Sequence, residues 1–260
     1  MPRIIAIANQ KGGVGKTTTS INLAASLAAS QQRVLLVDLD PQGNSTMGCG
    51  IDKSDVEHSV YDVLVGNLTI EQVAIHSDTA ELDVLASNAD VTAAEVELLD
   101  IEGKERRLYD AIEASQTHYD YVVIDCPPSL NMLTLNGLVA ADGVIIPMQC
   151  EYYALEGMSG LLQTIEQIRS TVNPRLVIEG IIRTMYDPRM SLTTDVSAQL
   201  IEHFGKLVYR TVIPRNVRLA EAPSYGMPAL RYDRLSKGSV AYMAMARELL
   251  RRESKQRQSA

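Results

Sequence analysis

A glycine-rich loop near the amino terminus constrains the fold of this 260-residue chain more than any other feature. Between an apolar, β-branched segment at 3–8 and a segment of helical period at 17–30 lies the run Lys11-Gly12-Gly13-Val14-Gly15-Lys16-Thr17-Thr18. Glycines let the backbone curl so that successive N–H groups point inward, and the amino end of a helix adds a dipole that favours anions. The loop therefore predicts a strand–loop–helix unit that binds phosphate.

Two side chains of this loop carry its chemistry. We expect the Lys16 ammonium to reach the β- and γ-phosphates of a nucleotide and the Thr17 hydroxyl to bind magnesium. The general pattern G-x-x-x-x-G-K-S/T would place its first glycine at position 10, where this chain has Gln10, and the chain has an additional lysine at position 11. A glycine-rich turn without a nucleotide is the alternative, and the strand–loop–helix context argues against it.

Acidic side chains follow two other apolar segments. Asp125 ends the run 122–124, and Asp38 and Asp40 follow the run 35–37. Ligands of open α/β sheets bind at the carboxyl ends of the strands. We expect Asp125 to hold magnesium, Asp38 to belong to the nucleotide site, and Asp40 to orient the water that attacks the γ-phosphate. The alternative is that these acids only cap the following helices or turns.

Apolar runs alternate with stretches of helical period along the chain, as in βα units. Strands are predicted at 3–8, 33–38, 82–86, 121–125, 143–148 and 177–183, with a weaker one near 207–213. Helices are predicted at 17–30, 104–116, 131–140, 155–171, 193–204 and 236–253, and a short helix is plausible within 49–75, to which we assign no chemistry. Several strands are apolar at nearly every position, which indicates helices on both faces. We predict one α/β domain over 1–253, a doubly wound and mostly parallel sheet, followed by a frayed polar tail at 254–260.

Positive charge is concentrated in the last third of the chain. Residues 1–182 hold 10 Lys and Arg against 25 Asp and Glu, a net charge of −15, whereas residues 183–260 hold 14 against 7, a net charge of +7. Such asymmetry is typical of a localised anion-binding surface. The alternative is a solvated basic surface with a charged final helix.

Other classes of protein lack support in the sequence. The three cysteines are widely spaced and form no CxxC pair, so neither a disulfide framework nor a zinc site is predicted. The longest apolar runs fall far short of the roughly 18 residues that span a bilayer. The amino terminus lacks the apolar region and cleavage site of a secretory signal, so we expect a cytoplasmic protein.

The motifs together resemble those of a known family. KGGVGKTT at 11–18, DLDPQGN at 38–44 and VVIDCPPS at 122–129 are similar to the motifs of the deviant Walker A ATPases, and within them the ParA/Soj partitioning ATPases. The resemblance continues through EYYALEG at 151–157, TMYD at 184–187 and IPRNVRLAEAPSYG at 213–226, and covers essentially the whole chain. Because the first predicted strand starts at Arg3, the chain resembles the short form without an amino-terminal helix-turn-helix extension.

This resemblance implies a homodimer in which two subunits sandwich two ATP molecules with Mg²⁺. The signature lysine, Lys11 here, crosses the interface to the partner's phosphates. It also implies slow ATP hydrolysis that a ParB-type, centromere-binding protein stimulates, and association with the nucleoid. The nucleotide contacts would come from Lys11, Gly12, Gly13, Val14, Gly15, Lys16, Thr17, Thr18 and Asp38, with Pro214 lining the base pocket.

Family members place arginines that contact DNA after TMYD and within the 213–226 motif, which correspond to Arg189 and Arg218. We add Lys237, Arg247 and Arg251 from the predicted last helix. Binding to double-stranded DNA would be dominated by phosphate contacts, and therefore sensitive to salt and nearly indifferent to sequence. For Arg189, an ordinary surface arginine is the alternative.

Three other functions use similar sequence features. A membrane-switching ATPase like MinD would use a terminal amphipathic helix; the last helix here carries Met245 and Leu249 but no Trp or Phe, which favours core packing. A shared iron–sulfur cluster, as in the nitrogenase iron protein, would need two cysteines near the dimer axis, and Cys126 and Cys150 are poorly placed for it. A ParA-like ATPase that positions another cargo stays open.

Overall fold

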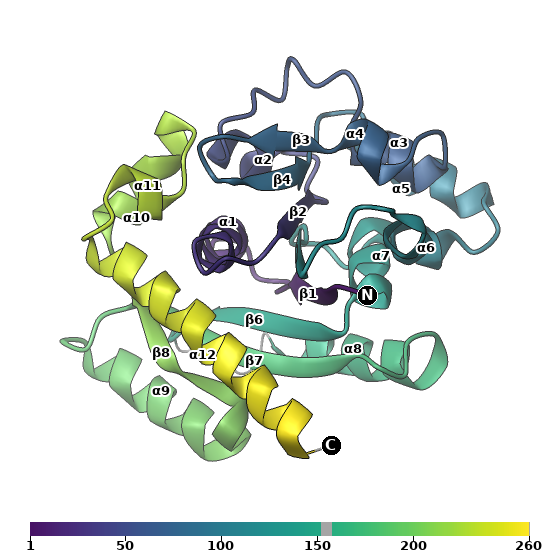
Figure 1. The fold of residues 1–260 in the computed structure, drawn as a ribbon. Coiled ribbons are helices and arrows are strands. Elements are labelled where there is room, and N and C mark those ends of the chain that lie inside the picture. Colours follow the sequence, from purple (N-terminus) through teal and green to yellow (C-terminus); the bar gives the residue numbers. More distant parts are fainter. Residues whose placement is uncertain (152–157, 260) are drawn as a thin grey trace.

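An eight-stranded sheet crosses the molecule in the order β3-β4-β2-β5-β1-β6-β7-β8 (Figure 1). It is seen in a computed structural model that describes residues 1–151 and 158–259. Every neighbouring pair of strands is parallel except β3 and β4. The predicted fold class, a mostly parallel α/β sheet, is therefore confirmed.

The strands lie close to the predicted positions. Their bounds are β1 Arg3–Ile7, β2 Val34–Asp38, β3 Ile75–Ser77, β4 Leu82–Leu85, β5 Tyr121–Asp125, β6 Gly143–Gln149, β7 Val177–Tyr186 and β8 Val208–Pro214. The short edge strand β3 was not predicted, because three residues are too few to show an alternating pattern. It pairs antiparallel with β4.

The helices fill the connections between strands. Their bounds are α1 Lys16–Ala28, α2 Asn44–Gly48, α3 Val60–Val65, α4 Ile70–Val73, α5 Val91–Glu97, α6 Arg107–Ala114, α7 Met132–Ala140, α8 Ser159–Thr171, α9 Ser191–Phe204, α10 Val217–Glu221, α11 Ala229–Tyr232 and α12 Lys237–Ser259. Short 3₁₀ helices are η1 Leu98–Asp100, η2 Lys104–Arg106, η4 Gly205–Leu207 and η5 Ala222–Tyr225.

The helices differ from the sequence prediction in several places. Helices α2, α5, α10 and α11 were not predicted, because each has seven residues or fewer, which is too short for a clear helical period. The region 49–75 contains helices α3 and α4, each of which begins with a capping box, at Ser59 and Thr69. Helix α12 continues to Ser259, so the segment 254–259 that was expected to fray is helical. The predicted start of the helix at 155–171 lies outside the described residues, and α8 begins at Ser159.

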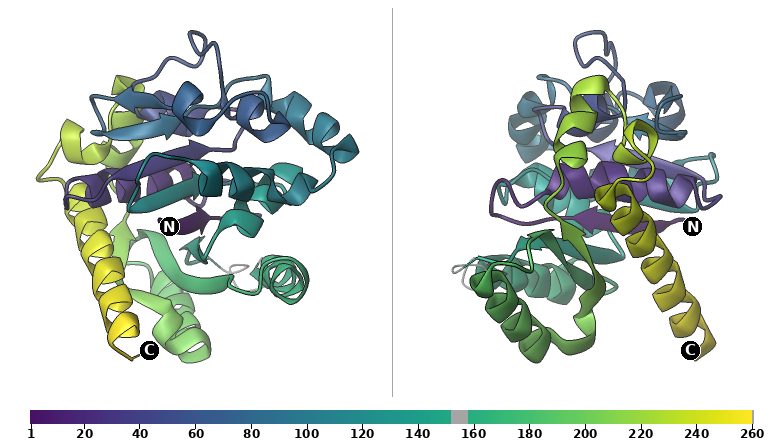
Figure 2. Two further views of the ribbon diagram at one scale, coloured as in Figure 1. Left: turned by 45° about the vertical axis from the view of Figure 1, so that its right-hand side comes forward. Right: turned by 90° about the vertical axis from the view of Figure 1, so that its left-hand side faces the viewer.

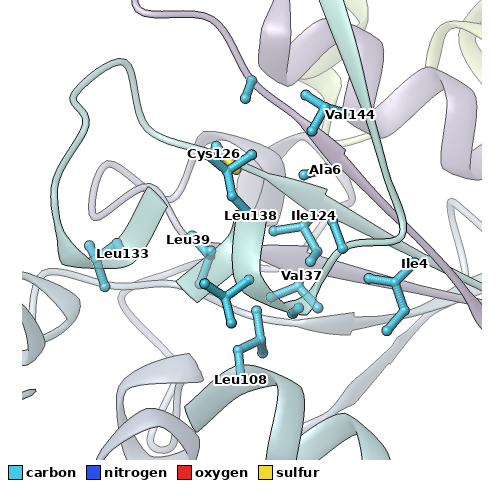
Figure 3. Packing of buried hydrophobic residues seen from close by; sticks show 14 of the residues in the cluster. Ile4, Ala6, Val37, Leu39, Leu108, Ile124, Cys126, Leu133, Leu138 and Val144 are labelled. Atoms are coloured by element: carbon cyan, nitrogen blue, oxygen red, sulfur yellow. The ribbon is translucent and has the colours of Figure 1, made fainter. Parts of the chain in front are cut away.

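Apolar cores lie on both faces of the sheet. Alternate residues of β1 separate between them: Ile5 and Ile7 pack with α1 and α12, whereas Ile4 and Ala6 pack in the core that α6, α7 and α8 cover. Figure 3 shows the second core, in which side chains from β1, β2 and β5 meet those of α6 and α7. Helices therefore cover both faces, which is the doubly wound arrangement.

Helix α12 packs along the molecule rather than projecting from it (Figure 2). Its residues Met245 and Leu249 are fully buried in the core shared with α1, as the core-packing prediction required. Among the described helices, none combines the length and the apolar character needed to cross a bilayer.

Candidate functional site

The glycine-rich loop follows β1 and leads directly into α1. Gly13 and Gly15 have φ angles of 73° and 89°, in the left-handed region that residues with a Cβ rarely adopt. Helix α1 begins at Lys16, so the first free N–H groups of the helix face the loop. A Cβ added at Gly12 or Gly13 would meet no atom within 4 Å, so the rim of the loop is open to a ligand.

Lys16 folds back over the loop. Its Nζ donates to the carbonyl oxygen of Lys11 at 3.2 Å, and only 7% of the residue is exposed. Burial lowers the pKa of Lys16, against the opposing attraction of Asp125. The ammonium is therefore positioned within the loop, where a phosphate would take over part of its lost hydration.

Side chains from neighbouring strands hold the loop in place. Thr184 of β7 donates its hydroxyl to the Val14 carbonyl oxygen at 2.8 Å. Asn9 donates to the Pro147 carbonyl oxygen at 2.8 Å and accepts from the Lys11 backbone N–H at 3.0 Å. The sequence assigned no role to Asn9 or Thr184, and their only signals were a polar residue directly after β1 and the TMYD motif.

Two buried carboxylates meet at the carboxyl ends of β2 and β5. Asp38 and Asp125 are register partners, and both are fully buried. Burial raises the pKa of each carboxyl, and the charge of Asp125 raises the pKa of Asp38 further. Two adjacent buried acids with raised pKa values form a site that a cation would stabilise.

Hydroxyl groups surround the two carboxylates. Asp125 accepts from Ser20 at 2.9 Å and from Ser45 at 2.7 Å, and the Thr17 hydroxyl also hydrogen-bonds to it. Asp38 accepts from both the backbone N–H and the hydroxyl of Thr46, each at 2.8 Å. The serines and Thr46 were missed in the sequence, because single hydroxyl residues carry no distinctive pattern.

The donor set fits a hard divalent cation that also binds phosphate. Within the described part of the chain, no group of three or more His, Cys, Asp or Glu side chains is placed to hold a metal. Mg²⁺ is bound through one or two carboxylates together with substrate phosphates, rather than by a complete protein cage. Thr17 and Asp125 offer oxygen ligands of that kind beside the phosphate loop.

Asp40 lies on a tight turn at the same edge. Its backbone N–H donates to Asp38 at 3.1 Å, and its carboxylate accepts from the Gln42 backbone N–H at 3.0 Å. The Ser87 hydroxyl donates to its carbonyl oxygen at 2.8 Å, which fixes the turn from β4. The charge of Asp40 acts on Lys16, so the turn brings this acid to the phosphate site.

Lys11 behaves differently from Lys16. Its side chain is 41% exposed, and its Nζ lies 2.7 Å from the Glu151 carboxylate at the end of β6. The ammonium is therefore held at the surface of the protein, outside the loop that Lys16 occupies. The remainder of the EYYALEG motif, 152–157, lies outside the described residues.

A pocket of about 180 Å³ opens beside the loop. Gly15 and Thr18 line it on the loop side, and Met185, Pro214 and Asn216 line it on the other. Met185 has a φ of 48°, a strained conformation that often marks a ligand site. Pro214 thus lines a pocket that adjoins the phosphate loop. Met185 and Asn216, which line the same pocket, were not assigned to it from the sequence.

The basic residues selected from the sequence are all exposed but do not gather at one point. Arg189 precedes α9 and pairs with Asp187 at 2.6 Å. Arg218 on α10 pairs with Glu221 at 2.8 Å and with Asp233 at 3.3 Å. Lys237, Arg247 and Arg251 follow one another along α12. Four of the five therefore lie on α10 and α12, and Arg189 lies on a separate segment before α9 (Figure 1).

Comparisons with known proteins agree with this geometry. A family model described as an AAA domain matches residues 2–178. The chain is similar to the chromosome partitioning protein ParA of Caulobacter vibrioides, with 51% identity over 253 residues that cover 96% of this chain and 95% of ParA. It is also similar to the sporulation initiation inhibitor protein Soj of Bacillus subtilis, with 51% identity over 249 residues that cover 96% of this chain and 98% of Soj.

A solved structure has the same fold. It is the cobyrinic acid a,c-diamide synthase from Mycobacterium smegmatis with bound ADP and magnesium, which superposes with a TM-score of 0.86. Its sequence is 38% identical, and the match covers 98% of this chain and 96% of that chain.

Proposed function

The chain belongs to the ParA/Soj family of P-loop ATPases, and from this membership we propose that it uses ATP as a switch for reversible binding to double-stranded DNA. It is an ATPase with ATP and Mg²⁺ as cofactors, of the kind that positions a cargo. The sequence is 51% identical to the partitioning proteins and 38% identical to the cobyrinic acid a,c-diamide synthase, which favours a partitioning function over a synthase activity. The observation that carries the proposal is the separation of the two loop lysines.

Lys16 and the backbone of the loop would bind the phosphates of the subunit's own ATP. Lys16 is buried against the loop and supplies a positive charge, and the N–H groups at the start of α1 supply the helix dipole. Thr17 and Asp125 would hold Mg²⁺, which when bound neutralises charge on the β- and γ-phosphates. The pocket that includes Pro214 would receive the base.

Asp40 would orient the attacking water. The Asp40 backbone N–H donates to the Asp38 carboxylate, and the Ser87 hydroxyl donates to the Asp40 carbonyl oxygen. Because these two hydrogen bonds hold the turn in place, the Asp40 carboxylate needs little further ordering during the reaction. Its half-buried position near Lys16 supports this role. Asp38, which is bonded to Thr46, would keep the turn and α2 in register with the site.

Lys11 would act across a dimer interface. Its Nζ is exposed and paired with Glu151 in the single subunit, so it can leave that contact at little cost, because exposed ion pairs contribute only about 0–1 kcal/mol. In a sandwich of two subunits it would contact the partner's ATP phosphates. Neutralising the γ-phosphate charge would then need lysines from both subunits. Loss of the γ-phosphate on hydrolysis would remove this contact and favour dissociation of the dimer.

The ATP-bound dimer would hold DNA through exposed basic side chains. The candidates are Arg189, Arg218, Lys237, Arg247 and Arg251. Pairing of two subunits doubles the number of phosphate contacts, which makes binding depend on ATP. A ParB-type partner would stimulate slow hydrolysis and release the dimer, so that the protein, cytoplasmic and associated with the nucleoid, segregates chromosomal or plasmid DNA.

A gel-shift experiment tests this function directly. The protein is mixed with two unrelated duplexes of equal length in the presence of ATP, ADP or no nucleotide, at about 0.05 M and about 0.2 M salt. We expect equal binding of both duplexes, only with ATP, and much weaker binding at the higher salt. Equal binding without nucleotide, or a strong preference for one sequence, would contradict the proposal.

A second measurement separates the other functions. Light scattering with Mg²⁺ and a non-hydrolysable ATP analogue should report a dimer, and co-sedimentation with anionic liposomes under the same conditions should leave the protein in the supernatant. A protein that sediments with liposomes in an ATP-dependent manner would be a MinD-like membrane ATPase instead. A dimer that binds neither DNA nor liposomes would position another cargo.

A further inference from the structure

A hollow of about 470 Å³ lies between α11 and α12, at a place that none of the proposed nucleotide contacts reaches. We call it the basic groove, and three arginines and one acid line it together with apolar side chains: Arg231, Arg234, Arg247, Glu81, Ala29, Leu230, Leu235, Val240, Met243 and Ala244. Its apolar residues are unusually open to solvent: Leu235 is 89% exposed and Val240 is 56% exposed. Apolar side chains in a concave surface indicate that something packs there.

The charged rim of the groove favours an acidic occupant. Within the described chain, Arg234 and Arg247 form no ion pair, and Arg231 pairs only with Glu81. Two unpaired guanidinium groups beside an apolar floor fit a surface that offers carboxylates together with apolar side chains. A DNA backbone would satisfy the arginines but leave Leu235 and Val240 in water. Arg247 is also one of the proposed DNA contacts, so DNA and an occupant of the groove would compete for this residue.

The chain itself presents such a surface. The segment from the end of α5 through η1 to Glu102 forms what we call the acidic ridge, which consists of Val96, Glu97, Leu99, Asp100 and Glu102. Val96 is 68% exposed and Leu99 is 53% exposed, although both are large and apolar. Asp100 and Glu102 form no ion pair with any described residue, so the ridge is complementary to the groove in both charge and polarity.

The two surfaces lie on opposite sides of the molecule. In Figure 1 and in the left view of Figure 2, α5 lies at the right edge and α11 at the left edge. A subunit therefore cannot dock its own ridge into its own groove. The opposite charges of the two surfaces match the charge distribution along the chain. The ridge lies in the acidic part at 1–182, and most of the groove lies in the basic part at 183–260.

From these observations we propose that the acidic ridge of one copy of this chain docks into the basic groove of a second copy. The contact is heterologous, so a pair of subunits still has one free groove and one free ridge, and further subunits can add to form an open chain. It differs from the ATP sandwich because it uses neither Lys11 nor the phosphate loop. It goes beyond the proposed function and needs no nucleotide.

The contact should be weak and sensitive to salt. Leu235 and Val240 on one side and Val96 and Leu99 on the other supply a small apolar centre, and small interfaces give transient complexes. The surrounding charges are exposed and are screened beyond a Debye length of about 10 Å at 0.1 M salt. Association should therefore appear at low salt and high protein concentration.

Sedimentation velocity of the full chain without nucleotide or DNA tests the contact. At about 0.05 M salt the average mass of the wild type should rise with concentration above 28.5 kDa, and at about 0.5 M salt it should return to that value. A wild type that stays at 28.5 kDa at every concentration in low salt overturns the proposal.

Two variants that reverse charge on one surface each make the test specific. Arg234→Glu alters only the groove, and the double variant Asp100→Lys/Glu102→Lys alters only the ridge. Each should associate at least about tenfold more weakly than the wild type, because like charges would then face each other. A 1:1 mixture should associate again, since the unaltered ridge of the first variant fits the unaltered groove of the second.

That recovery in the mixture is the signature of a head-to-tail contact. A mixture that associates no better than its two components overturns the proposal. So does an Arg234→Glu variant that loses DNA binding while its self-association is unchanged, because the groove would then be a DNA surface.

Controls match each change in charge. Lys206→Glu on η4 matches the groove variant, and Asp195→Lys/Glu202→Lys on α9 matches the ridge variant; both should associate as the wild type does. Leu235→Ser, which changes no charge, should weaken association as well. All these side chains are exposed, so the midpoint of thermal unfolding should be nearly unchanged in every variant. This measurement therefore distinguishes a lost contact between subunits from a lost fold.

Discussion

Two regions of this protein hold their charged groups in opposite ways. One is the nucleotide edge, formed by the phosphate loop and the carboxyl ends of β2 and β5, and the other is the set of exposed basic residues proposed to contact DNA. At the nucleotide edge, Asp38, Asp125 and Lys16 are buried, and each is hydrogen-bonded by the protein. Among the proposed DNA contacts, Arg218 and Arg189 are exposed and are paired with carboxylates, either nearby in sequence or, for Arg218, also with Asp233 at the end of α11. The charged groups of the first region are held by hydrogen bonds inside the protein, whereas those of the second are solvated and partly neutralised.

This difference teaches where single side chains matter most. A buried charge that loses its partner costs far more free energy than an exposed one, because water cannot replace the lost contact. At the nucleotide edge we therefore expect large effects of single substitutions. At the proposed DNA contacts the binding energy would be spread over many phosphates, so each substitution should have a small effect.

Asp40→Ala should have the largest effect. Without a carboxylate to orient the water, ATP hydrolysis should fall by about 100-fold to 10,000-fold, while ATP still binds and the dimer persists on DNA. Steady-state phosphate release and filter binding of ATP measure the two quantities. Asp55→Ala, which removes an exposed acid from the same part of the chain, is the control. Normal turnover in the Asp40 variant would remove this residue from the mechanism.

Lys16→Ala should weaken ATP binding by at least about thirtyfold, the effect of truncating one partner of a buried charge contact. Titration calorimetry with a non-hydrolysable analogue measures the affinity, and thermal unfolding checks that the loop variant still folds. An unchanged affinity would mean that the buried lysine contributes only to the structure of the loop.

Lys11→Ala should separate binding from pairing. ATP should still bind, but the ATP-dependent dimer should dissociate at least about tenfold more readily, as expected for the loss of one charged hydrogen bond. Analytical ultracentrifugation with the analogue measures this. Glu151→Gln, which removes only the partner of Lys11 within the subunit, should leave the dimer intact. If the Lys11 variant pairs as the wild type does, this lysine does not act across the interface.

Arg218→Ala should have the smallest effect. It should weaken DNA binding a few-fold and reduce the slope of log affinity against log salt by about one or two per dimer, without changing ATP-dependent pairing. Fluorescence anisotropy at several salt concentrations gives the slope, and Lys206→Ala is the control for removal of an exposed charge. A slope equal to the wild type would move the DNA surface away from α10. An effect as large as that of Lys16→Ala would abolish the contrast between the two regions.

Much of the fold was predictable because the strands are buried on both faces. Runs such as 34–37 and 121–124 are apolar at every position, and all predicted strands exist. The prediction of secondary structure failed for short elements and for the end of the last helix, where helical propensity and packing are not visible as an apolar pattern. Strand β3 has three residues, and α12 extends to Ser259 although its end is polar.

The candidate site was predictable where its residues belong to short sequence motifs that follow predicted strands. Lys16, Thr17, Asp38, Asp40 and Asp125 come to one edge because parallel strands end there together. Their partners Ser20, Ser45, Thr46 and Thr184 carried no signal, since an isolated hydroxyl residue occurs everywhere in a sequence. The ion pair between Arg218 and Asp233 could not be predicted from the sequence either.

The sequence by itself determined the phosphate loop, the α/β alternation and the separation of acidic and basic parts, because each depends on neighbouring residues or on simple counting. Only the tertiary structure decided which strands are adjacent, that Lys11 meets Glu151 while Lys16 turns inward, and that the acidic ridge and the basic groove lie on opposite sides. The physical reason is that burial and long-range pairing depend on how distant segments pack, and local patterns do not contain that information.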